Sequence, residues 1–345
     1  MTLFTQFPAE LEDRVDVAQK FIAETGADCL GVEIHVPPKN ISLDGIQIVR
    51  ELLEEFERQV SPSGDVSFHR TMHFPFLPNN AFNIGDLDPV KREKTTVLLR
   101  YSAEFAATLD IKVINTHLNA TCFLTEWNKL YHRDSVRNEV MRNSCETVNQ
   151  VIEAFEANQV TLSLENVPYP FESIYDDPPI SPYMGVFRDE FAEIFDSVQS
   201  TALSYCFDAL HANILFTTAQ VYVENGYDFG LYWGLYPTQE PEFHKIVAEG
   251  PFYSLTGLEY IVSNVHLGGQ KGAFYPGGNP LVEGSMLDPN DESLLAFYSD
   301  VFQLIAANSR FRDISAVLEV KEEDYYHSKN LPASLVTCWN LIQGI

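Results

Sequence analysis

The run Leu162-Ser163-Leu164-Glu165 is a short apolar stretch that ends in a carboxylate, and the same pattern recurs along the chain. Five other apolar runs also end in a side chain that can bind a metal ion, namely His73, His117, Asp208, His266 and Glu319. Successive runs lie about 40 to 60 residues apart, which leaves room for one strand, one helix and their loops. Short apolar strands that alternate with helices are typical of a parallel sheet covered on both faces.

The sequence therefore predicts an α/β fold, a (β/α)8 TIM barrel that forms one domain over residues 1–345. Eight strands are expected at 3–6, 29–36, 66–74, 111–116, 160–166, 203–207, 260–266 and 316–320. Helices are expected from Pro8 to Gly26 and at 43–60, 91–109 and 133–157. In such a barrel the carboxyl ends of all strands meet at one mouth, so the six metal-binding side chains should converge there.

Two segments are longer than a minimal barrel needs. Residues 168–183 are rich in proline and aromatic residues, and residues 225–254 are aromatic and loop-like. Both follow strands that supply expected metal ligands, so both should overhang the mouth. A lid over the substrate and a packed surface excursion are both compatible with this composition. The aromatic residues are equally compatible with a subunit contact in a homo-oligomer.

The composition limits the partners and the compartment. Asp and Glu number 49 against 22 Lys and Arg, giving a net charge of −27 that repels polyanions and argues against nucleic acid. No apolar stretch is long enough to span a bilayer, and no signal peptide is recognisable at the start of the chain. The five cysteines are widely spaced and show no CxxC pattern. We therefore expect a cytoplasmic protein with reduced thiols that acts on a small molecule rather than at a membrane.

The side chains at the strand ends indicate which metals the site prefers. Glu165, Asp208, His266 and Glu319 combine carboxylates with imidazole, a mixture that suits zinc or manganese. His73 and His117 extend the set towards a second ion, with Glu165 able to bridge both because a carboxylate has two oxygens. The cofactor is thus expected to be Zn or Mn, as one or two ions. His211, three residues after Asp208, is a candidate for a metal or substrate contact, or for a structural role at a helix start.

Several short motifs taken together make the chain resemble the xylose isomerase-like TIM-barrel superfamily, which contains sugar isomerases, sugar epimerases and zinc-dependent apurinic endonucleases. The motifs are Gly26-Ala27-Asp28, Gly31-Val32-Glu33-Ile34, the run from His73 to Asn79, Thr116-His117, Leu164-Glu165-Asn166, the run from Phe207 to His211, Val265-His266-Leu267, Lys271-Gly272, Glu283-Gly284 and Leu318-Glu319. They cover residues 26–319, nearly the whole chain, and their order and spacing make the resemblance specific.

Resemblance to the endonuclease branch implies one ion held by His73, His117 and Glu165, and a second held by Glu165, Asp208, His266 and Glu319. The same resemblance implies that His211 and an Asp-x-His pair downstream of His266 hold a third ion. Residues 273–283 contain no Asp-x-His, so the chain departs from the branch at this point. The missing pair and the net charge both argue against a nuclease of abasic DNA.

Resemblance to the isomerase and epimerase branch implies a single ion at Glu165, Asp208, His266 and Glu319. Glu165 and Glu319 are then the catalytic pair that exchanges a proton at the carbon next to a carbonyl. His211, Lys271 and Glu33 are the expected substrate contacts in this interpretation. The function expected first is a metal-dependent isomerase or epimerase of a sugar or polyol; the alternatives are a dinuclear metal hydrolase and a non-catalytic barrel that binds metal or metabolite.

Overall fold

A closed parallel barrel forms the centre of the molecule. The computed structural model describes residues 2–6, 11–75, 82–118, 121–123, 133–168, 180–182, 184–226, 240–271, 282–323 and 327–344. Its barrel strands, in order around the barrel, are β1 (Thr2–Gln6), β12 (Phe311–Leu318), β9 (Val262–Leu267), β8 (Leu203–Asp208), β6 (Thr161–Glu165), β4 (Val113–His117), β3 (Ser67–His73) and β2 (Cys29–His35). All neighbouring pairs are parallel. The predicted TIM-barrel fold is therefore confirmed.

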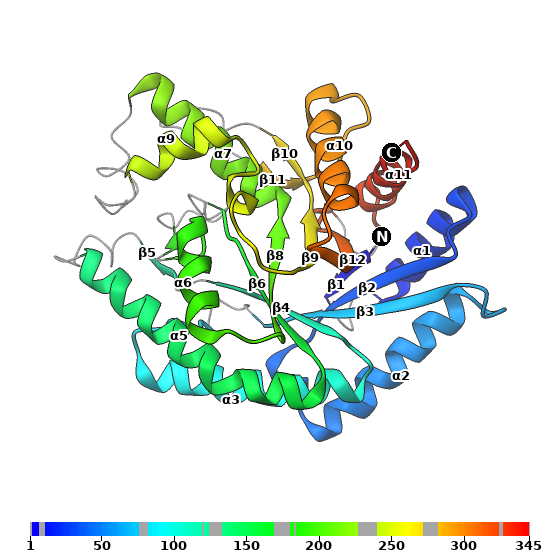
Figure 1. The fold of residues 1–345 in the computed structure, drawn as a ribbon. Helices are drawn as coiled ribbons and strands as arrows, with labels where there is room; N and C mark the ends of the chain where they lie inside the picture. Colours follow the sequence, from blue (N-terminus) through cyan, green and yellow to red (C-terminus); the bar gives the residue numbers. More distant parts are fainter. Residues whose placement is uncertain are drawn as a thin grey trace.

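Helices surround the barrel, as Figure 1 shows. They are α1 (Leu11–Thr25), α2 (Leu43–Val60), α3 (Pro89–Thr108), α5 (Arg133–Asn158), α6 (Arg188–Val198), α7 (Ala209–Asn225), α9 (Glu240–Glu249), α10 (Glu292–Ala307) and α11 (Asn330–Gln343). Helix α2 has the predicted bounds because its signals are strong. The Ser42 hydroxyl accepts a hydrogen bond from Gly45 N at 3.2 Å, and Val49, Leu53 and Phe56 form one buried face.

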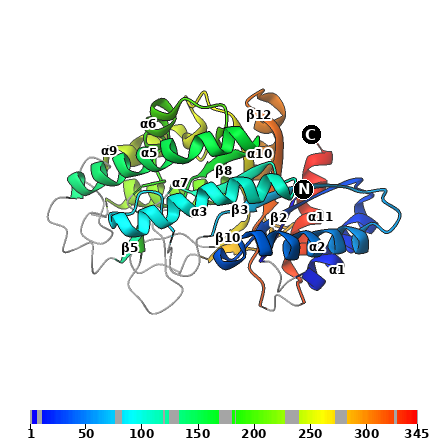
Figure 2. The same cartoon turned by 90° about the horizontal axis from the view of Figure 1, so that it is seen from below.

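The two ends of the chain close the barrel together. Strand β1 pairs with β12 on one side and with β2 on the other. On the outside, the Phe21 ring of α1 meets Trp339 of α11 edge to face, with ring centroids 5.7 Å apart. The view in Figure 2 places α1, α2 and α11 on the same side of the barrel. No helix among the described residues has the length and apolar character of a membrane span.

The inside of the barrel is polar near its mouth, and an irregularity in β9 contributes to this. The register pairs Tyr205 with Val262 but Cys206 with Asn264, so the pairing skips Ser263. Side chains alternate between the two faces of a strand, and an extra residue changes which of them face inward. Beyond the skipped residue, Asn264 and His266 point into the barrel beside the inward side chains of β8. Such irregularities re-aim side chains next to active sites.

The long connections near the mouth contain more structure than the sequence predicted. Two short antiparallel pairs join β10 (Gly269–Lys271) to β11 (Val282–Ser285) and β5 (Thr121–Phe123) to β7 (Ile180–Pro182). The prediction that 225–254 is loop-like is wrong for 240–249, which form α9. Phe243 and Ile246 of α9 are buried against Leu215 and Tyr222 of α7, and this apolar face stabilises the helix. Residues 169–179, 183 and 227–239, on which the lid prediction depends, lie outside the described residues.

Candidate metal centre

Six side chains from six strands meet at one end of the barrel, as the sequence predicted. Four are the last residues of their strands, His266 is the last but one of β9, and Glu319 follows directly after β12; the four are His73 of β3, His117 of β4, Glu165 of β6 and Asp208 of β8. Glu165 and His266 are fully buried, and the Glu319 side chain is 28% exposed. Exposure of Glu319 leaves one side of this cluster open towards solvent.

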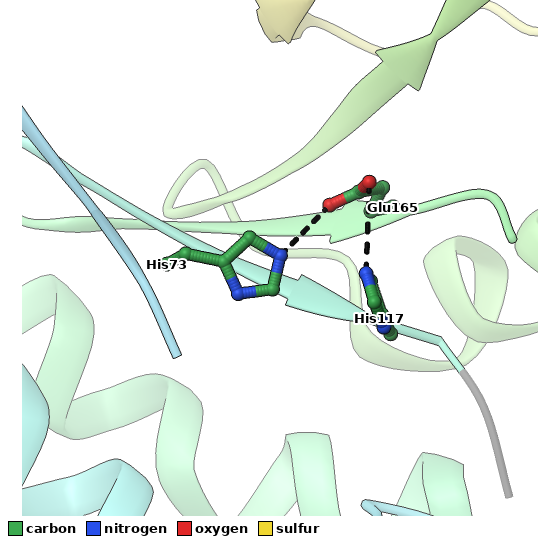
Figure 3. Close-up of side chains that lie close together, drawn as sticks. All are labelled: His73, His117 and Glu165. Atoms are coloured by element: carbon green, nitrogen blue, oxygen red, sulfur yellow. Dashed lines mark ion pairs between the residues drawn. The ribbon is translucent and has the colours of Figure 1, made fainter. Parts of the chain in front are cut away.

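His73, His117 and Glu165 form the first group of possible ligands, shown in Figure 3. His73 Nε2 lies 3.3 Å from Glu165 Oε2, and His117 Nε2 lies 3.7 Å from Glu165 Oε1. His73 Nδ1 is 2.8 Å from the carbonyl oxygen of Phe74, to which it donates as N–H. Once the ring is neutral, that hydrogen bond keeps the proton on Nδ1 and leaves the lone pair on Nε2, the nitrogen that faces Glu165; this is the tautomer that a metal ligand needs.

The second group is centred on the imidazole of His266. Its Nδ1 lies 3.3 Å from Glu165 Oε1 and 3.2 Å from Glu319 Oε1. Carboxylates from β6 and from the end of β12 therefore meet at one nitrogen of β9. Glu165 belongs to both groups, and its bridging of two ions stays a prediction.

Asp208 and His211 form the third group with Glu165. Asp208 caps helix α7, because its Oδ1 accepts a hydrogen bond from His211 N at 2.7 Å. Its Oδ2 lies 2.9 Å from His211 Nδ1, which also donates to the Asn166 carbonyl at 2.8 Å. His211 Nε2 lies 3.2 Å from Glu283 Oε1. His211 is thus part of the cluster, and a carboxylate of β11 stands beside it.

The arrangement fits a divalent cation. Glu165 Oε1 and His266 Nδ1 are buried and make no hydrogen bond with the described residues, although they are only 3.3 Å apart. Two ligands that each lie ~2.1 Å from a tetrahedral zinc ion are about 3.4 Å from each other. A buried carboxylate without enough donors is costly unless a cation neutralises it. The donor set of imidazole and carboxylate is also the one that zinc and manganese accept.

The charges of the cluster shift its pKa values in opposite directions. Burial raises the pKa of Glu165, but the neighbouring His266 and His117 outweigh this and hold it well below its usual range. Burial lowers the pKa of His117 to about 3, so this imidazole is neutral and ready to bind a metal. Burial also lowers the pKa of His73, yet the Glu165 and Glu33 carboxylates outweigh this effect and raise it.

Two of the expected substrate contacts differ in exposure, since one lies at the surface and the other inside the barrel. Lys271 is exposed on β10, and its side chain makes no ion pair or hydrogen bond within the described part of the chain. Glu33 is fully buried inside the barrel, with Oε1 3.1 Å from His266 Nε2. Both substrate contacts stay predictions.

Sequence reasoning overlooked three inward side chains that surround the cluster. Asn115, Cys206 and Asn264 each precede an identified ligand by two residues on the same strand. Asn115 Nδ2 donates to Glu165 Oε2, and the Cys206 sulfur lies within 4.8 Å of possible ligand atoms of Glu165 and His266. The alternation of side chains along a strand was the signal that could have found them.

Comparisons with known proteins agree with this fold. A family model described as xylose isomerase-like TIM barrel matches residues 20–330, which confirms the resemblance inferred from the motifs. No curated protein sequence gives a match. Among solved structures, a D-tagatose 3-epimerase-like protein has a TM-score of 0.56 at 16% identity, with 100% of this chain and 99% of that chain covered.

Two further structures show the same similarity. A Thermus thermophilus protein soaked with ZnCl2 has a TM-score of 0.54 at 18% identity, with coverage of 100% of this chain and 99% of that one. D-psicose 3-epimerase from Clostridium cellulolyticum, in a structure with D-tagatose, has a TM-score of 0.52 at 13% identity, with coverage of 99% and 95%. At such identities the likeness shows a shared fold.

Proposed function

This chain belongs to the xylose isomerase-like TIM-barrel family, and we propose that it is a divalent-metal-dependent isomerase or epimerase of a sugar or related polyol. The observation that carries this proposal is the meeting of Glu165 and Glu319 at one nitrogen of His266, at 3.3 and 3.2 Å. Two carboxylates at one mouth provide an acid and a base for proton transfer. The sugar epimerases among the structures of similar fold support the choice of substrate class.

The proposed chemistry is a proton transfer next to a carbonyl. One carboxylate of the pair removes the proton from the carbon beside the carbonyl of a ketose, and the bonding electrons move to the carbonyl oxygen, giving an enediolate. The other glutamate returns a proton to the opposite face of that carbon for epimerisation. For isomerisation the proton returns instead to the former carbonyl carbon, while the hydroxyl proton of the first carbon passes to the enediolate oxygen, so that the carbonyl moves to the first carbon.

Glu165, Asp208, His266 and Glu319 are the residues that would hold the cation. A divalent ion bound there supplies positive charge that stabilises the enediolate oxygens. Asn115 holds Glu165 in place by donating to Oε2, and the backbone N–H of His211 does the same for Asp208. Burial of Glu165 keeps water away from the deep side of the reacting carbon, whereas the partly exposed Glu319 lies on the side open to substrate.

Hydrogen exchange into a ketose tests the proposal. Protein loaded with Mn²⁺ or Zn²⁺ should exchange the hydrogen next to the carbonyl of D-tagatose or D-fructose for deuterium in D2O, which NMR detects. Glu319→Gln should lower the exchange rate by about 100-fold or more, because the loss of a positioned general acid or base costs about 10²–10⁴ in rate. Glu323→Gln, at an exposed site four residues further on, is the matched control. Unchanged exchange in the Glu319 variant would remove that residue from the reacting centre.

A dinuclear hydrolase is the second candidate, and the group of His73, His117 and Glu165 favours it. These two histidines exceed what a single-ion epimerase requires. Two ions that share a ligand can activate a water molecule and stabilise an oxyanion at the same time. This function requires two ions per chain, whereas the epimerase mechanism uses one.

A further inference from the structure

Glu33 is a buried carboxylate that the proposed mechanism leaves without a role. It lies on β2, is fully shielded from solvent and reaches across the inside of the barrel. Its Oε2 accepts hydrogen bonds from Thr71 Oγ1 of β3 and from Asn264 Nδ2 of β9, both at 2.8 Å. Strands β2 and β9 are separated by β1 and β12 in the barrel order, so this side chain connects distant parts of the wall.

The second oxygen of Glu33 faces the imidazole of the metal centre. Glu33 Oε1 lies 3.1 Å from His266 Nε2 and makes no hydrogen bond of standard geometry within the described residues. Asn264 and His266 are two residues apart on β9 and face the same way, so Glu33 meets this strand at two points. The two anchors on Oε2 fix the direction in which Oε1 points.

His266 therefore lies between two sets of carboxylates. Its Nδ1 faces Glu165 and Glu319, and its Nε2 faces Glu33. A neutral imidazole carries its proton on one nitrogen only, and the nitrogen that binds a metal must be the unprotonated one. The group that accepts the hydrogen bond from the His266 N–H therefore decides whether Nδ1 is free to act as a ligand.

Two neighbours compete for Nε2. Asn115 Nδ2 lies 3.2 Å from it, and an amide that donates there would force the proton onto Nδ1. Glu33 Oε1 at 3.1 Å requires the opposite, with the proton on Nε2. Hydrogen bonds to an ionised acceptor are roughly twice as strong as neutral ones. Glu33 Oε1 has no other donor in the described structure, so this buried oxygen would stay unpaired if the His266 proton were on Nδ1. We therefore expect the proton of His266 on Nε2, donated to Glu33.

We propose that Glu33 is a positioning residue of the metal centre: its Oε1 accepts the Nε2 proton of His266 and so presents the Nδ1 lone pair to a cation between Glu165 and Glu319. Carboxylates that orient metal-binding histidines in this way are general features of metal sites, and their loss weakens metal affinity by about 10- to 100-fold. The inference rests on the metal centre of the proposed function. From the sequence, Glu33 was expected to contact the substrate; the proposal instead gives it the role of orienting His266.

Nitrogen NMR of the wild-type protein tests the inference without any substitution. In Zn²⁺-loaded protein labelled with ¹⁵N-histidine, the His266 ring should carry its proton on Nε2 and bind the ion through Nδ1. A ring that binds through Nε2, or that carries its proton on Nδ1, overturns the proposal. A wild-type protein that binds no divalent ion contradicts the proposed function instead, so the two failures are distinguishable.

Zn²⁺ affinity of a conservative variant supplies the second readout. Glu33→Gln should bind Zn²⁺ about 10- to 100-fold more weakly in a chelator competition, and its His266 Nε2–H signal should shift or disappear. Glu190→Gln is the matched control, since Glu190 is also fully buried but accepts its hydrogen bonds from Gly185, Val186 and Phe187 N and from Arg137 Nε, and none of these residues is a candidate ligand. Equal Zn²⁺ affinity in a folded Glu33→Gln protein and in wild type would contradict the proposal.

Discussion

Glu165 is the residue on which the candidate centre depends. It belongs to every group of possible metal ligands among the described residues except the one formed by Glu33, His266 and Glu319. Four imidazoles, those of His73, His117, His211 and His266, lie within 4 Å of its oxygens. Such a concentration of histidines around one buried carboxylate has a low energetic cost only when the rings are protonated or share a cation. The protonation of these rings therefore competes directly with metal binding.

The affinity for Zn²⁺ should increase between pH 6 and pH 8. Burial lowers the pKa of His266, but Cys206 and the carboxylates of Glu165, Glu33 and Glu319 outweigh this effect, so the net shift is well upward. The pKa of His73 is also raised, whereas His117 is already neutral above about pH 3. A ring with a raised pKa must release a proton before it binds a metal, so each such proton adds up to about tenfold in affinity per pH unit.

Chelator competition at pH 6, 7 and 8 measures this dependence. Calorimetry in two buffers of different ionisation enthalpy gives the number of protons released. An affinity that is constant or falls over this interval would show that the rings of His73 and His266 do not lose protons on binding.

At the scale of elements, the sequence predicted the strands and the ends that carry ligands, because each strand is a continuous apolar run. Helix α2 was predicted with its observed bounds from a cap and a regular apolar face. Strand β12 begins at Phe311 instead of 316, and α9 was taken for a loop, because short amphipathic segments among aromatic residues give a weak periodic signal. The contact between Glu33 and His266 could not be predicted, since it needs the barrel to close and β9 to skip Ser263.

The connection that leads from β7 to α6 includes a close contact beside the metal centre. Gly185 has φ +93°, its carbonyl accepts from Val167 N at 2.7 Å, and a Cβ built on it would lie 1.6 Å from Leu118 O. Leu118 directly follows His117. Gly185→Ala should therefore destabilise the protein by about 3 kcal/mol or more, because a left-handed backbone and a backbone clash add together.

Gly64→Ala is the matched control for that substitution. Gly64 also has a positive φ, +75°, but a Cβ there meets nothing within 4 Å. It should cost only about 1–2 kcal/mol, the penalty of the left-handed conformation. Urea unfolding of both variants measures the difference. Equal losses of stability in the two variants would show that the backbone at Leu118 can shift at no energetic cost, which contradicts the prediction.

For the whole molecule, a barrel with a polar interior at one end and net charge of −27 suits a small polar substrate and a bound cation better than a polyanion. The family model covers most of the chain, and the single-domain organisation over 1–345 stays our proposal. The substrate could not be predicted at the level of a named sugar. Specificity comes from loops at the mouth rather than from the barrel strands, and the same fold serves many reactions.

The metal content of the purified protein tests the central claim most directly. After dialysis against Zn²⁺ or Mn²⁺ and removal of free ions, mass spectrometry should find one or two equivalents bound to the wild type, and Glu319→Ala should lose one of them. One equivalent that His73→Ala leaves unchanged supports the epimerase, whereas two that fall to about one in His73→Ala support the dinuclear hydrolase. A wild-type protein that retains no divalent ion, or a Glu319→Ala variant that retains the full amount, would contradict a metal centre at this barrel mouth.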